Sequence, residues 1–126
     1  MMPFRLAWLW WSIGTLLVLL DIVLSLAPSG AAAPLVPDKV THFSTYFLLA
    51  FWFVSLVARR RIAAVTAVVA LGGVLELLQG LTPARQPEWL DLFANTSGAL
   101  LALCIVMLLP FNVFAVVERF AGQSSR

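Results

Sequence analysis

The chain has 126 residues, of which 62% are hydrophobic and only 11% are charged, and its formal net charge is +2. A soluble domain usually has about 25% charged residues, and a soluble domain of this size has too little interior to bury so many apolar side chains. The composition therefore excludes a soluble enzyme and a nucleic-acid-binding domain. It predicts a small integral membrane protein.

Four apolar runs follow one another along the chain, and each is long enough for a helix that crosses a bilayer. They cover residues 6–27, 42–58, 62–81 and 89–109. All seven prolines lie outside these runs or at their ends, where a missing backbone donor costs little. We therefore expect an all-α membrane protein with four transmembrane helices in a bundle, forming a single domain over residues 1–126. Residues 111–121 are expected to add an amphipathic helix on the cytoplasmic surface.

The first run also has features of a cleavable secretory signal, because it follows Arg5 and precedes three alanines at 31–33. However, the run is longer than the apolar core of a usual signal, and Asp21 interrupts it. We therefore expect the first helix to be retained.

The distribution of basic residues predicts how the helices are oriented. Most of them fall at the two termini and between the second and third runs. This larger group is Arg5, Arg59, Arg60, Arg61, Arg119 and Arg126, and the remaining basic residues are Lys39 and Arg85. Because cytoplasmic loops carry the excess of Lys and Arg, both termini are expected in the cytoplasm. Trp8, Trp10 and Trp11 are then expected at the inner membrane interface, and Trp89 at the outer one.

Polar residues within and beside the runs are the most informative part of the sequence, because a carboxylate at the bilayer centre costs roughly 2.5–3.5 kcal/mol. They recur at helical spacing, together with small residues, on one face of each helix. These faces are Gly14, Asp21 and Ser25; Asp38, His42 and Thr45; Gly72, Glu76 and Gln79; and Asp91, Asn95, Gly98 and Ala102. Small residues permit close helix contacts in membranes, so we expect these faces to point into the bundle. At 1.5 Å per residue, the polar members lie within ~10 Å of the outer boundary. The sequence therefore predicts a polar pocket on the extracytoplasmic side.

The predicted ligand-binding residues of this pocket are Asp38, Lys39, His42, Glu76, Gln79, Arg85, Asp91 and Asn95. Structural roles stay open for several of them at this point. Asp38 and Asp91 could cap or begin helices, while Glu76 and the two amides could join helices by hydrogen bonds. Asp21 could be explained by a single ion pair with Lys39.

Cysteine and histidine usage argues against a metal centre. The chain has one cysteine, Cys104, and one histidine, which excludes an intramolecular disulfide and a Cys/His metal site. We expect neither a metal nor a cofactor, and we interpret Cys104 as a small buried packing residue.

The chain contains, in this order, Asp38-Lys39-x-x-His42-Phe43, then Glu76-x-x-Gln79, then Arg85 separated by five residues from Asp91-x-x-x-Asn95-x-x-Gly98. In order and spacing this set resembles the VanZ-like family of small membrane proteins, over about half of the chain. Two positions depart from the family pattern: Ala102 stands where a second glycine is common, and Glu88 where a small residue is usual. The family's namesake is associated with low-level resistance to the glycopeptide teicoplanin. The resemblance therefore implies a cell-envelope role in the bacterial plasma membrane.

Three functions suit such a pocket. The preferred one is binding of an envelope-lipid head group, a lipid-linked precursor or a lipoglycopeptide, in which Lys39 and Arg85 would contact phosphate. The second is an intramembrane enzyme that acts on a lipid-linked or phospholipid substrate, with His42 and Glu76 as acid–base groups; the sequence has no signature nucleophile for it. The third is a small proton-coupled exporter, whose site would be expected nearer the bilayer midplane. No nucleic-acid partner is expected.

Overall fold

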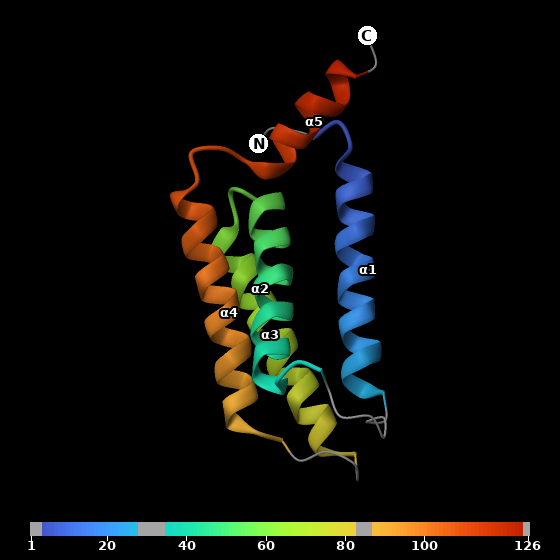
Figure 1. Cartoon of the computed structure of the whole chain (residues 1–126), viewed down its shortest axis with the longest axis vertical. Helices are drawn as coiled ribbons and strands as arrows, with labels where there is room; N and C mark the ends of the chain where they lie inside the picture. Colours follow the sequence, from blue (N-terminus) through green and yellow to red (C-terminus); the bar gives the residue numbers. More distant parts are fainter. Residues whose placement is uncertain (1–3, 28–34, 83–86, 125–126) are drawn as a thin grey trace.

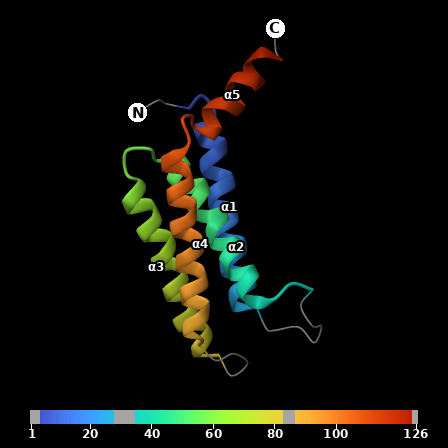
Figure 2. The ribbon, with the colours of Figure 1, turned by 60° about the vertical axis from the view of Figure 1, so that its left-hand side comes forward.

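The computed structural model describes residues 4–27, 35–82 and 87–124. These residues form the helices α1 (Ala7–Leu26), α2 (Asp38–Leu56), α3 (Arg61–Gly80), α4 (Trp89–Leu108) and α5 (Val113–Gln123). Helices α1 to α4 run up and down along the long axis, and α5 projects from one end at an angle to them (Figures 1 and 2). Within the described ranges there is no strand, so the all-α expectation is confirmed for them. We call the end with α5 the α5 end, and the opposite end, where α2 and α4 begin, the site end. The alanines considered as a signal cleavage site lie outside the described residues.

Three of the bundle helices, α1, α3 and α4, have the length and apolar composition to cross a membrane. The sequence predicted a fourth span in α2, but α2 is less apolar because its first two turns contain Asp38, Lys39 and His42. Helix α2 contacts α1, α3, α4 and α5 and lies between α1 and α4 in Figure 1, while Asp38 and Lys39, at its end, stay 60% and 39% exposed. Neighbouring helices therefore cover much of its surface. A membrane span by α2 and the cytoplasmic location of the termini stay predictions.

Helix α2 begins four residues before the predicted run because Pro37 is extended and ends the preceding loop. The Pro37 carbonyl accepts hydrogen bonds from the amides of Val40 (3.0 Å) and Thr41 (3.1 Å). Asp38 is thus the first helical residue and not the N-cap, so its carboxylate is free for contacts with other side chains. Its negative charge in the first turn also suits the helix dipole.

The polar faces predicted from the sequence point into the bundle. Five of their carboxylate and amide members are buried, namely Asp21, Glu76, Gln79, Asp91 and Asn95. Cys104, in contrast, is exposed on α4, so its interpretation as a buried packing residue was wrong. The face of α4 that meets the other helices is occupied instead by residues such as Ala99, Ala102 and Val106.

Close packing of α2 against α4 depends on Gly98. A Cβ atom added to Gly98 would lie 2.2 Å from the carbonyl oxygen of Phe43, so the backbones of the two helices are in direct contact there. One turn further along α4, Ala102 is fully buried. These two small residues form the close contact that the sequence predicted, and alanine suffices at the second position.

At the α5 end, α5 is fastened to the start of α1. The Glu118 carboxylate accepts hydrogen bonds from the backbone amides of Arg5 (2.8 Å) and Leu6 (2.9 Å) and from the Trp10 indole (2.8 Å). The two amides directly precede Ala7, the first residue of α1, and therefore have no partner within the helix. Phe114 packs against the Trp10 ring, with ring centroids 4.9 Å apart. Trp10 is therefore buried under α5, and its position at the inner membrane interface stays a prediction.

Replacing Gly98 by alanine should destabilise the bundle. The added methyl group would meet a backbone oxygen that cannot rotate away, and overpacking of this kind costs about 1–3 kcal/mol. The expected result is a lower midpoint of thermal unfolding in detergent. Gly73→Ala is the matched control, because its added Cβ would meet only Leu92 Cδ1 at an ordinary 3.9 Å. Equal destabilisation by both variants would contradict the packing argument.

The attachment of α5 should weaken in acid. Slight burial raises the pKa of the Glu118 carboxyl, but hydrogen bonds from Leu6, Trp10 and Arg5 lower it by more, to below the ordinary value of 4.5. Because the pKa is lower in the folded state, this stabilisation is present above pH 4.5 and is lost as the pH falls through the lowered pKa. We expect tryptophan emission to change in that range. The change should be absent in Trp10→Phe, and Glu118→Gln should show the acid spectrum at neutral pH. A wild-type spectrum unaffected by acid would show the attachment to be independent of this carboxylate.

Candidate functional site

Lys39 is the centre of an ionic network at the site end. Its ammonium donates hydrogen bonds to Asp91 Oδ1 and to Glu88 Oε2, the latter at 2.5 Å, and lies 3.8 Å from Asp38 Oδ2. The Asp91 side chain is only 9% exposed, whereas that of Lys39 is 39% exposed. Lys39 therefore neutralises a buried carboxylate of α4 from the first turn of α2. The Lys39 ammonium therefore already pairs with three carboxylates.

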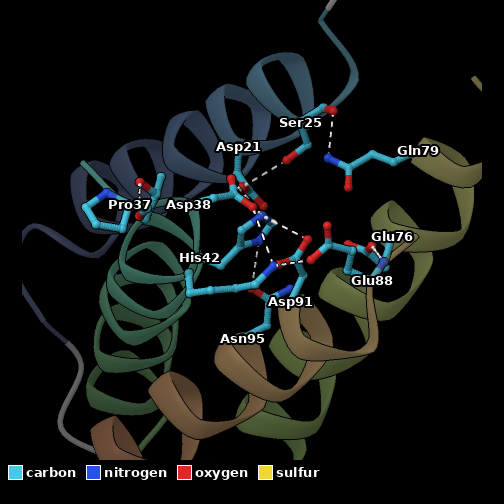
Figure 3. A network of polar contacts seen from close by, with 12 residues as sticks. Asp21, Ser25, Pro37, Asp38, His42, Glu76, Gln79, Glu88, Asp91 and Asn95 are labelled. Carbon is cyan, nitrogen blue, oxygen red and sulfur yellow. Dashed lines mark hydrogen bonds and ion pairs between the residues drawn. The ribbon is translucent and has the colours of Figure 1, made fainter. Parts of the chain in front are cut away.

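His42 lies one turn deeper on α2, against the same carboxylates (Figure 3). Its Nε2 atom is 3.6 Å from Asp38 Oδ1 and 3.7 Å from Asp91 Oδ2. Its Nδ1 atom is 3.1 Å from the amide oxygen of Asn95, which is 2% exposed. Since an amide oxygen can only accept a hydrogen bond, Nδ1 carries a proton.

A second polar network joins α1 to α2 and α3. Asp21 accepts hydrogen bonds from the Tyr46 hydroxyl (3.1 Å) and the Ser25 hydroxyl (3.4 Å). The Gln79 amide donates to the Ser25 carbonyl at 2.8 Å. The prediction of an ion pair between Asp21 and Lys39 was wrong. Lys39 pairs with Asp91 of α4, and Asp21 accepts a hydrogen bond from Tyr46 instead.

Glu76 fixes the start of α4. It is buried, and its Oε1 atom accepts a hydrogen bond from the Glu88 amide at 2.7 Å. This bond satisfies a backbone donor at the N-terminal end of α4. In the part of the chain that the structure describes, no hydrogen bond or ion pair joins Glu76 to His42. Glu76 and His42, the acid–base groups considered for an intramembrane enzyme, are therefore not in direct contact.

Seven of the eight predicted site residues can be placed. One connected network contains Asp38, Lys39, His42, Asp91 and Asn95, to which Glu76 is joined through Glu88. Gln79 belongs to the second network, and Arg85 lies outside the described residues.

Two members of the networks were missed by the sequence analysis. Tyr46 follows His42 by four residues and so shares its helix face, and it is the only tyrosine of the chain. Glu88 was noted only as a departure from a family pattern, although it precedes Asp91 by three residues. Helical spacing was thus the signal that could have found Tyr46, whereas the Glu88–Lys39 pair required the packing of α2 against α4.

A pocket of about 280 Å³ lies between α1, α2 and α3 beside these networks. Its polar lining comes mainly from the site end, and most of its apolar lining comes from leucines nearer the middle of α1 and α2, although Leu24 lies at the site end of α1. The polar residues include Asp21, Ser25, Asp38, His42, Thr45 and Gln79, and the apolar ones include Leu17, Leu20, Leu24, Leu48 and Leu49. The pocket is therefore amphipathic along its length.

These features define a small helical membrane protein with an ionic network at one end of its bundle. The family model VanZ/LLP1 matches residues 2–110, and the chain belongs to this family. The match extends the resemblance seen in the polar residues to include α1 and the rest of α4. No curated protein and no solved structure matches the chain.

Replacing Lys39 by methionine should destabilise the protein, because it leaves the buried Asp91 carboxylate without its cation. An acceptor stranded in this way costs about 1–3 kcal/mol. We expect a lower unfolding midpoint in detergent, with partial recovery in the double variant Lys39→Met/Asp91→Asn, which removes the stranded charge. Arg119→Met, at an exposed position of α5, is the control and should have little effect. Failure of the second substitution to recover any stability would argue against the pairing.

Proposed function

We propose that this protein binds the polar head group of an envelope lipid in the pocket between α1, α2 and α3. The observation that carries the proposal is the amphipathic lining of that pocket. An envelope lipid has the same division, with a polar head and apolar chains. Its head group would lie at the site end, next to Asp21 and Gln79, and the start of an acyl chain would lie along the leucines. On this proposal the site end faces the extracytoplasmic side of a bacterial plasma membrane.

The charges of the pocket favour a head group that donates hydrogen bonds. The acidic lining residues are the two carboxylates Asp21 and Asp38; His42 and Tyr46 also line the pocket, and the Tyr46 hydroxyl donates to Asp21. Lys39, which the sequence suggested for phosphate, is held by three carboxylates instead. A carboxylate forms charge-assisted hydrogen bonds with an amine. An amine-bearing head group such as ethanolamine therefore fits the pocket better than a purely anionic one.

The size of the pocket favours a lipid head group over an intact antibiotic. A volume of about 280 Å³ is just below the usual range for small-molecule sites. A glycopeptide is too large to be enclosed there and could enter only with a part of its structure. A role in glycopeptide resistance would on this proposal act through lipid at the membrane surface.

The proposal can be tested with two phospholipids of equal acyl chains, phosphatidylethanolamine and phosphatidylglycerol. We expect protein purified in the presence of a metal chelator to retain the ethanolamine lipid preferentially, as measured by native mass spectrometry. Asp21→Asn should weaken this binding about tenfold or more, since a hydrogen bond to a charged group contributes ≈ 1.5–3 kcal/mol. Cys104→Ser, on the exposed face of α4, is the control. Equal retention of both lipids, unchanged by Asp21→Asn, would contradict the proposal.

A further inference from the structure

Asp38 and Asp91 each direct one carboxylate oxygen to Lys39 and the other to His42. Lys39 contacts Oδ2 of Asp38 and Oδ1 of Asp91. The other oxygen of each group, Oδ1 of Asp38 and Oδ2 of Asp91, is directed to His42 Nε2, at 3.6 and 3.7 Å. One ligand atom from each of Asp38, His42 and Asp91 lies within 4.8 Å of the other two, and Lys39 is not among these ligands.

The protonation of His42 makes this convergence unusual. Asn95 holds the proton of the ring on Nδ1, so a neutral His42 presents the lone pair of Nε2 to two negatively charged oxygens. Such an arrangement is repulsive unless either a second ring proton, on Nε2, or a metal cation lies between the three atoms. An Nδ1–H that donates to a fixed oxygen is also the arrangement found behind most histidine metal ligands, because it orients the ring and leaves Nε2 free to bind.

The charge balance of the cluster also calls for a cation. Asp38, Asp91 and Glu88 supply three carboxylates, whereas Lys39 supplies one ammonium. Among the described residues, this leaves a formal excess of two negative charges when His42 is neutral. The Asp38 and Glu88 side chains are 60% and 57% exposed, whereas that of Asp91 is 9% exposed, and like charges held this close together repel one another. A single divalent cation would make the cluster neutral.

We propose that Asp38 Oδ1, His42 Nε2 and Asp91 Oδ2 form a site for one divalent transition-metal ion, such as Zn²⁺. Zinc bonds of about 2.0–2.2 Å in tetrahedral geometry place neighbouring ligand atoms roughly 3.4 Å apart. The separations of Nε2 from the two oxygens exceed this by only a few tenths of an ångström, and the three ligand atoms lie within 4.8 Å of one another, so rotation of the two carboxylates would close the site. The mixed nitrogen and oxygen ligands favour such an ion over Mg²⁺. The cysteine and histidine count did not reveal the site, because two of its three ligands are carboxylates.

The proposed ion would be accessible and incompletely coordinated. The Asp38 side chain is 60% exposed and that of His42 is 15% exposed, and both residues line the pocket between α1, α2 and α3. Three protein ligands leave at least one position of a zinc ion for water or another ligand. The ion would therefore lie at the polar end of the pocket, where it can exchange with the medium.

The decisive measurement uses the single histidine of the chain. Metal-free protein with ¹⁵N-labelled histidine gives one pair of imidazole nitrogen signals, which can be followed by NMR as Zn²⁺ is added. We expect about one equivalent of Zn²⁺ to shift Nε2 to the range of a metal-bound nitrogen while Nδ1 keeps its proton. Mg²⁺ at the same concentration should cause no such shift. This measurement needs only the wild-type protein and no lipid.

Variants should then distinguish the residues that bind the ion from Asn95, which orients the His42 ring. Competition with a coloured chelator should show that His42→Gln and Asp91→Asn no longer bind the ion. Asn95→Leu, which removes the acceptor of the Nδ1 proton, should weaken binding about 10–100-fold, whereas Asn95→Asp should preserve it. Glu118→Gln, at the α5 end, is the control and should bind as the wild type does.

Three results would overturn the proposal. They are no shift of Nε2 with Zn²⁺, a shift that Mg²⁺ reproduces, or zinc binding that persists in His42→Gln at wild-type affinity. In the first case the cluster would be balanced by a proton on Nε2 instead of a metal. None of these results depends on lipid binding, which is measured in the presence of a chelator, so the metal site and the head-group proposal can fail separately.

Discussion

The contact between the backbones of α2 and α4 determines most of what is particular to this protein. Gly98 meets the carbonyl of Phe43, and this contact fixes the position of the two helices along each other. Asn95 lies one turn before Gly98, and His42 directly precedes Phe43. The same contact therefore brings His42 against Asn95 and Asp91, and Lys39 against Asp91 and Glu88. A side chain at Gly98 would separate the helices and with them the ionic network.

Much of this arrangement can be predicted from the sequence. Apolar runs and prolines give the helices to within a few residues, and helical spacing gives the faces that point inward. Depth along each helix then shows that the polar residues gather at one end of the bundle, as the structure confirms for Asp38, His42, Asp91 and Asn95. Both kinds of prediction depend only on the geometry of a single helix, which the sequence determines closely.

The pairings between helices could not be predicted in the same way. Periodicity shows that Asp21 points inward, but not whether it meets Lys39 or Tyr46, because that depends on which helices are neighbours. The burial of Trp10 depends on α5, which folds back over the start of α1. The exposure of Cys104 similarly depends on which face of α4 is used. Glu76 shows the same limit for the prediction of function. Its carboxylate, inside an apolar run, suggested an acid–base role, but in the structure it accepts a hydrogen bond from the backbone amide of Glu88.

The central position of α2 has a consequence for how the protein is made. Its first two turns are too polar for α2 to enter lipid easily by itself, and the groups that neutralise them, Asp91 and Glu88, belong to α4. During synthesis α2 leaves the ribosome well before α4 does. Its lysine and aspartate must meanwhile stay near water or the insertion machinery. The site end of α2 would therefore reach its final position late, and assembly of the ionic network would be one of the last steps in membrane integration.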